Sequence, residues 1–396
     1  MITRGDASPR SRPFGCFAIS MFAAVLCSVM RVSAAGLTSP EPLTKAYDLI
    51  LDARFDDAHG QLQQACPPAP RPTCEVLEAV ADYWQILLDQ ENTSRDAKLI
   101  AKINASIAST EGWVAREPTR AEAWFYNGGS YGTRVLLRGL REEYVAAARD
   151  GKRIHDSLRQ AVTLDPKLTD AYFGLGLYHY YAAIAPTAAR VLRFLLLLPA
   201  GDRTGGLKEM EQTRTQGMLL RGEADYQLHL IYLWYERQTM RSLALVDGLR
   251  SRYPHNPVFY LRLANVQSDY LKNHQAALQT YRLLFDAARA GRVAAPSISD
   301  VNARLGMAQE MAALCDTEQA IDQLRTVIAQ RPGAPYAAVS RAYYQLGVVF
   351  DRIGRRSDAT SAYESARAAN PPDDRLELNA KSRAMLKRPP IARGCK

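Results

Sequence analysis

Two cysteines are spaced so that they could bond to each other. Cys66 and Cys74 enclose a proline-rich run that lies between two helical patterns. In an oxidising compartment the two sulfurs can meet, so the sequence predicts a disulfide that closes a short loop and contributes roughly 2.5 kcal/mol to stability. A pair of this spacing without further ligands is a poor zinc site. The sequence leaves open whether Cys315 and Cys395 also pair.

The histidines, serines and acidic residues show none of the common catalytic or metal-binding spacings. The six histidines include no HExxH motif, and no GxSxG elbow occurs. His179 and His229 stand where packing residues are expected. In the turn Gly201–Arg203, Asp202 is expected to cap a helix and not to bind phosphate. We therefore expect no catalytic residue, no metal and no cofactor, and enzymatic activity is the least favoured function class.

The charge of the chain is mildly basic and thinly spread. Of the formal net charge of +9, the first 35 residues account for +3, which leaves +6 for the remainder. No dense stripe of lysine and arginine occurs, and basic residues do not alternate with aromatic ones in the pattern typical of nucleic-acid binding. Nucleic acid is therefore not an expected partner.

The amino terminus has the features of a secretory signal. Arginines up to Arg12 precede an apolar stretch over residues 14–30, and small residues follow at residues 32–35. Residues 1–35 are therefore predicted to be a signal peptide that is cleaved near Ala34 and Ala35, so that the mature protein is periplasmic or secreted. The alternative is a membrane anchor that is not cleaved.

A repeat of about 34 residues explains how much of the chain is organised. From residue 340 to residue 373, small and apolar residues recur at Tyr343, Leu346, Gly347, Phe350, Gly354, Ala359, Tyr363, Ala366 and Pro371. With these residues the segment resembles a unit of the tetratricopeptide-repeat family. Gly347 and Ala359 let two helices approach closely, and Pro371 stops the second helix.

The same arrangement recurs along the chain and predicts an all-α fold, an α-α superhelix of stacked helical pairs. Residues 223–373 fit four tetratricopeptide units, and residues 121–222 fit extended units with an insertion at about residues 182–204. Residues 36–120 fit degenerate helical repeats that contain the disulfide loop, and residues 374–396 a carboxy-terminal helix and tail. Two-residue alternation bounded by turns, the pattern of a strand, is absent.

The insertion is the main departure from the repeat. Residues 191–198 form an apolar run interrupted only by Arg193, which is far too short to span a bilayer. Three interpretations are open. The insertion is a helix buried against neighbouring units, or a segment at residues 184–199 that touches lipid or an apolar partner, or a mobile lid.

The residues around the insertion carry a second resemblance. The run Gly174–Tyr181, Pro186, the leucine-rich run and the stretch Gly201–Leu207 resemble bacterial exported tetratricopeptide-repeat proteins of unassigned function. More distantly, they are similar to the eukaryotic tetratricopeptide-repeat 39 proteins and the yeast inclusion-body-clearance family. That eukaryotic family is implicated in protein turnover and lipid-linked clearance inside the cell, whereas this chain is expected to be exported. The resemblance therefore implies the architecture alone.

In this repeat class the first helix of each unit lines a concave wall, which suggests where a partner would bind. The candidate groove residues are Phe173, Leu177, Tyr180, Tyr181, Gln227, Ile231, Trp234, Tyr235 and Asn265. The aromatic side chains would supply contact area, and Gln227 and Asn265 would hydrogen-bond an extended peptide backbone. Equally favoured is the alternative that the insertion packs onto the aromatic residues and makes them interior wall.

The sequence therefore predicts a non-enzymatic interaction scaffold or adaptor of the cell envelope, with a peptide or protein partner in the concave groove. The alternative is an envelope-associated assembly factor that makes peripheral contact with membrane, or with an apolar partner, through residues 184–199. An envelope enzyme is the third class. Neither the identity of the partner nor the oligomeric state follows from the sequence.

Overall fold

The structure is a computed structural model that describes residues 36–185 and 200–387. Within these residues all regular structure is helical, which confirms the predicted all-α class. The helices of the first range are α1 (Pro40–Leu51), α2 (Phe55–Ala65), α3 (Arg71–Leu87), α4 (Asp96–Arg116), α5 (Ala121–Leu140), α6 (Tyr144–Leu164) and α7 (Ala171–Ile184). The helices of the second range are α9 (Arg203–Gln216), α10 (Arg221–Trp234), α11 (Thr239–Arg252), α12 (Pro257–Asn265) with its π-helical continuation η1 (Val266–Tyr270), α13 (His274–Arg289), α14 (Pro296–Ala313), α15 (Thr317–Gln330), α16 (Ala338–Arg352), α17 (Arg356–Ala368) and α18 (Leu378–Lys387).

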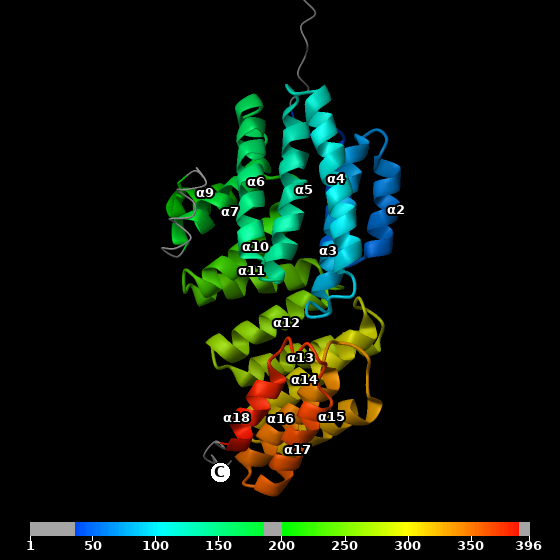
Figure 1. Ribbon diagram of the computed structural model, residues 1–396, viewed down its shortest axis with the longest axis vertical. Coiled ribbons are helices and arrows are strands. Elements are labelled where there is room, and N and C mark those ends of the chain that lie inside the picture. The colour runs from blue at the N-terminus through cyan, green and yellow to red at the C-terminus, as the bar shows by residue number, and fades with distance from the viewer. Residues whose placement is uncertain (1–35, 186–199, 388–396) are drawn as a thin grey trace, which may run out of the picture. The chain divides into compact units, whose positions relative to one another are not determined.

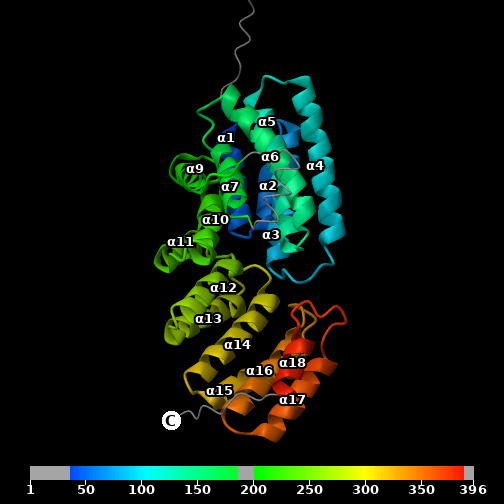
Figure 2. The same ribbon diagram turned by 60° about the vertical axis from the view of Figure 1, so that its left-hand side comes forward.

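Consecutive helices pack side by side. Figure 1 and Figure 2 show this for α5 with α6 and for α16 with α17. From α10 to α17, four such pairs follow one another along the chain. An arrangement of this kind is compatible with a helical solenoid, in which each pair buries its apolar face on its neighbours.

Glycines set the closest approaches between neighbouring helices. A Cβ atom at Gly347 in α16 would lie 2.5 Å from the ring of Tyr363 in α17, within one helical pair. A Cβ atom at Gly306 in α14 would lie 2.3 Å from the ring of Tyr281 in α13, between two pairs. Any side chain at either position would push the helices apart, because a buried tyrosine ring in a close-packed core cannot give way.

The hydrophobic core consists of clusters of buried side chains that follow one another along the stacked helices. One cluster of buried apolar side chains extends from Leu43 to Phe259, and a second extends from Ala264 to Tyr363. Most helices supply buried side chains spaced three or four residues apart, as in α2 and α15, whereas α10 is buried along nearly its whole length. The stack therefore owes its stability to contacts between neighbouring helices more than to any single hairpin.

The first helices also contact helices that lie far along the sequence. The ring of Trp84 in α3 lies 5.0 Å from that of Tyr226 in α10 and 5.7 Å from that of Phe259 in α12. The side-chain amide of Asn256 donates to the carbonyl of Leu51 at 2.7 Å. The amino-terminal helices are thus packed against the middle of the stack, a contact that a linear array of repeats would not make.

Helices α7 and α9 flank the insertion, and a disulfide joins the segments of α2 and α3. Helix α9 begins after Asp202, whose carboxylate accepts a hydrogen bond from the backbone N–H of Gly205 at 2.8 Å, so Asp202 caps this helix. The sulfurs of Cys66 and Cys74 are joined in a disulfide between α2 and α3.

No helix among residues 36–185 and 200–387 is long and apolar enough to cross a bilayer.

Three predictions fall on residues outside those ranges. They are the signal peptide at residues 1–35, the leucine-rich part of the insertion at residues 186–199, and the pairing of Cys395 with Cys315.

Candidate functional site

A large apolar cavity lies among the helices of the amino-terminal half. Its volume is about 820 Å³, within the range of about 300–1,000 Å³ that is typical of ligand pockets in proteins. Its walls come from α1, α3, α5, α6, α7 and α10, so it forms only where segments distant in sequence meet. Most of the side chains on these walls are aliphatic or aromatic. A site of this composition binds by excluding water from apolar groups.

Glycines in α5 create part of the space in this cavity. Gly128, Gly129, Gly132 and Gly139 all line it. A Cβ atom at Gly132 or Gly139 would meet nothing within 4 Å, whereas one at Gly128 would overlap the side chain of Leu158. The absence of side chains at Gly132 and Gly139 therefore leaves open volume, while the absence at Gly128 allows close helix packing.

Four large apolar side chains that line the cavity are exposed to solvent, and we call them the exposed lining. Tyr144 and Val145, at the start of α6, are 66% and 55% exposed. Tyr181 in α7 and Tyr235 after α10 are 37% and 46% exposed, and their rings lie 5.7 Å apart. Exposed apolar groups around an apolar cavity are typical of a surface that a partner covers.

Two carboxyl groups lie on the otherwise apolar wall. Asp170 precedes α7 and accepts hydrogen bonds at 2.8–2.9 Å from the backbone N–H groups of Met218, Leu219 and Leu220. This carboxylate therefore holds the turn that leads into α10, which is a structural role. Burial raises the pKa of Asp170, and the three N–H donors oppose that rise.

The second carboxyl group, that of Glu223, has weaker partners. The hydroxyl of Tyr47 donates to it at 3.3 Å, and the side-chain amide of Gln227 donates to it at 3.2 Å. Burial raises the pKa of Glu223, and these donors together with the indole of Trp84 oppose that rise. The indole N–H of Trp84 nevertheless completes no hydrogen bond of normal geometry. Glu223 is thus a desolvated acid held by neutral donors.

Five of the nine predicted groove residues line the cavity, and four do not. The five are Phe173, Leu177, Tyr181, Gln227 and Tyr235.

Of those four, Tyr180 and Ile231 are fully buried in the core between α7 and α10 and present no surface to a partner. Trp234 is half exposed and lies outside the cavity lining. The side-chain carbonyl of Asn265 accepts a hydrogen bond from the hydroxyl of Tyr281 at 3.1 Å, away from the cavity.

Sequence reasoning missed the two features that distinguish this cavity. The first is Glu223, an acid in a helix whose neighbours in sequence are also buried. The second is the set of glycines in α5 at residues 128, 129, 132 and 139. The glycine spacing was a usable signal, because glycine in a helix interior costs about 1 kcal/mol relative to alanine and needs a packing or functional reason.

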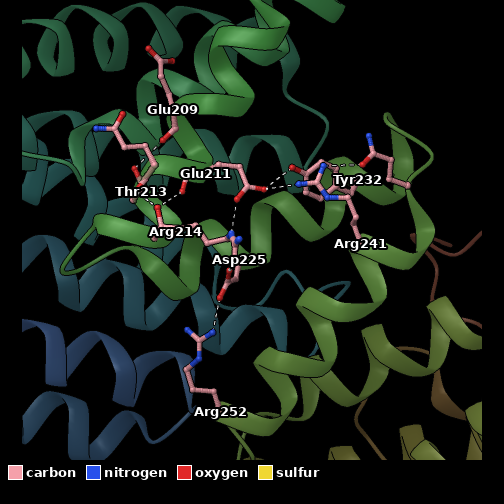
Figure 3. Close-up of polar contacts among 11 residues, drawn as sticks. Glu209, Glu211, Thr213, Arg214, Asp225, Tyr232, Arg241 and Arg252 are labelled. Carbon is pink, nitrogen blue, oxygen red and sulfur yellow. Dashed lines mark hydrogen bonds and ion pairs between the residues drawn. The ribbon is translucent and has the colours of Figure 1, made fainter.

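A polar network outside the cavity joins α9, α10 and α11 (Figure 3). The hydroxyl of Tyr232 donates to Glu211 at 2.7 Å, and the guanidinium of Arg241 lies 4.2 Å from the centre of the Tyr232 ring. Arg252 pairs with the buried Asp225 at 2.6 Å. These groups already have partners of complementary charge or hydrogen bonding, so we interpret the network as structural.

One nucleophile and base pair occurs in the core. Nδ1 of His229 lies 2.7 Å from Oγ of Ser242, a distance compatible with a catalytic dyad. Both residues are fully buried between α10 and α11, so no substrate could reach the hydroxyl. Among residues 36–185 and 200–387, no group of three or more histidine, cysteine, aspartate or glutamate residues is placed to hold a metal ion.

Comparison with known proteins identifies no family. No family model matches the chain, and no curated protein matches it. The function must therefore be inferred from the cavity and its surroundings.

Proposed function

We propose that this chain is a non-catalytic interaction scaffold of the tetratricopeptide type, which holds an apolar segment of a peptide or protein partner in the cavity. The observation that carries the proposal is the cavity of about 820 Å³ with its exposed lining of Tyr144, Val145, Tyr181 and Tyr235. Apolar side chains of a partner would leave water on entering the cavity, which contributes about 25 cal/mol per Å² of buried apolar surface.

We further propose that the protein works after export. The disulfide between Cys66 and Cys74 supports this, because such bonds persist in oxidising compartments such as the periplasm. The exposed lining also supports a second candidate, peripheral contact with a membrane or another apolar partner. The sequence placed that contact on residues 184–199, most of which lie outside the described residues. The first proposal therefore depends on the cavity alone.

The test uses two helical glycines that both have room for a side chain, of which only one lines the cavity. Gly132 in α5 lines the cavity, whereas Gly248 lies on the exposed side of α11, and a Cβ atom at either would meet nothing within 4 Å. Leucine at either position should improve helix propensity by up to about 1 kcal/mol, so both variants should fold. Only Gly132→Leu places a side chain in the cavity, which makes Gly248→Leu the matched control.

The measurement is fluorescence anisotropy with short fluorescein-labelled peptides rich in leucine, compared with peptides of equal length in which serine replaces leucine. We expect the leucine-rich peptides alone to bind, and Gly132→Leu to weaken that binding by about tenfold or more while Gly248→Leu does not. Equal binding of the two peptide types, or equal affinity of the two variants, would refute the proposal.

A further inference from the structure

The charged side chains among the described residues of the cavity wall all have the same sign. Asp170 and Glu223 are the acidic residues of the described lining, and that lining contains no lysine, arginine or histidine. Asp170 already accepts three backbone hydrogen bonds. A ligand that complements the charge of this wall would therefore bring a cation to Glu223.

Glu223 retains the capacity to accept such a cation. A carboxylate offers about four acceptor positions, and the two donors that reach Glu223 do so at 3.3 Å and 3.2 Å, at the long end of the range for hydrogen bonds. Within residues 36–185 and 200–387, no basic side chain forms an ion pair with this carboxyl group. Burial disfavours the ionised form of Glu223 and raises its pKa, and a cation that enters would oppose that effect and favour the carboxylate.

The aromatic residues beside Glu223 favour a particular kind of cation. Tyr47, Tyr83 and Trp84 line the same cavity, and the faces of aromatic rings attract ammonium groups. An ammonium group that pairs with Glu223 would therefore lie among aromatic rings as well.

We propose that the cavity selects a partner segment in which one ammonium group, either a lysine side chain or a free amino terminus, accompanies apolar residues and pairs with Glu223. This inference rests on the proposed function and adds the chemistry by which the partner is recognised. The apolar wall supplies contact area for the segment, and the carboxyl group with its aromatic neighbours supplies the selectivity.

The first experiment measures the cavity chemistry with small probes and needs no peptide. Isothermal titration calorimetry of the full chain would compare octylamine, which is an ammonium ion at neutral pH, with octanol and octanoate, which have the same chain length. We expect octylamine to bind more tightly than octanol by about tenfold, and octanoate to bind most weakly. Equal affinity for octylamine and octanol would overturn the inference.

Two variants assign the effect to its residue and place. Glu223→Gln keeps the shape of the side chain and removes the charge, so it should weaken octylamine binding by about tenfold and change octanol binding by less than about twofold. Gly132→Leu should weaken both probes. Circular dichroism of each variant would verify folding, and unchanged octylamine affinity in folded Glu223→Gln would overturn the inference.

The second experiment separates this inference from the proposed function. A leucine-rich peptide with one lysine is compared with the same peptide carrying norleucine at that position. Tighter binding of the lysine peptide supports both statements. Equal binding of the two peptides supports the scaffold and overturns the ammonium preference. Octylamine binding that depends on Glu223, with neither peptide bound, overturns the scaffold and supports the ammonium site.

Discussion

We expect the protein to lose stability in mild acid, and replacing His229 with glutamine should reduce that loss. His229 lies in α10 and is fully buried, with Nδ1 at 2.7 Å from Oγ of Ser242. Nε2 of His229 has no hydrogen-bond partner in the described chain. Burial lowers the pKa of His229 to about 4, and the hydrogen bond with the backbone of Ser242 offsets only part of that effect.

The sign and size of the effect follow from the difference in proton affinity between folded and unfolded chains. The unfolded chain binds a proton at His229 near the ordinary pKa of 6.5, and the folded protein does so only near 4. The stabilising contribution is therefore present above about pH 6.5 and is lost as the pH falls toward 4. With about 1.36 kcal/mol for each pKa unit, His229 accounts for a loss of about 2 kcal/mol between about pH 7 and about pH 5.

The assay is urea unfolding followed by far-ultraviolet circular dichroism, on wild type and on His229→Gln. Between about pH 7 and about pH 5, the free energy of unfolding of wild type should fall by about 2 kcal/mol more than that of the variant. Above about pH 7.5 the difference in free energy of unfolding between the two proteins should not vary with pH, which is the internal control. If the two proteins lose stability in parallel on acidification, His229 is not held as a buried neutral imidazole and the reasoning is wrong.

Three further changes should alter stability in defined directions. Gly347→Ala should lower the free energy of unfolding by about 1–3 kcal/mol in urea titrations, because the new methyl group overlaps the ring of Tyr363, and an unchanged value would contradict the close packing of α16 on α17. Glu223→Gln should raise stability relative to wild type more at about pH 8 than at about pH 4, because burial raises the pKa of Glu223 and the wild-type contribution is lost as the pH rises through that raised value. A difference that is constant over this range would refute a buried carboxyl group. Replacing Cys66 and Cys74 together with alanine should lower stability by about 2.5 kcal/mol, measured by thermal unfolding without reductant, and should leave the helical content unchanged.

The placement of the candidate site could be predicted only in part. The rule that first helices face inward selected Phe173, Leu177 and Gln227, which do line the cavity. The same rule selected Tyr180 and Ile231, which are buried instead. A rule of this kind assumes one curvature along the whole stack. Here the packing of α3 against α10 and α12 changes which sides of these helices are covered.

The sequence by itself determined the helical pairs. Contacts such as that of Gly347 with Tyr363 join residues of adjacent helices, so a repeated local pattern of small and large side chains specifies them. The cavity was decided only by the tertiary structure. Its walls bring Tyr47, Trp84 and Glu223 together from helices far apart in the chain. That meeting joins residues as far as 176 positions apart, such as Tyr47 and Glu223, so no single stretch of residues encodes it.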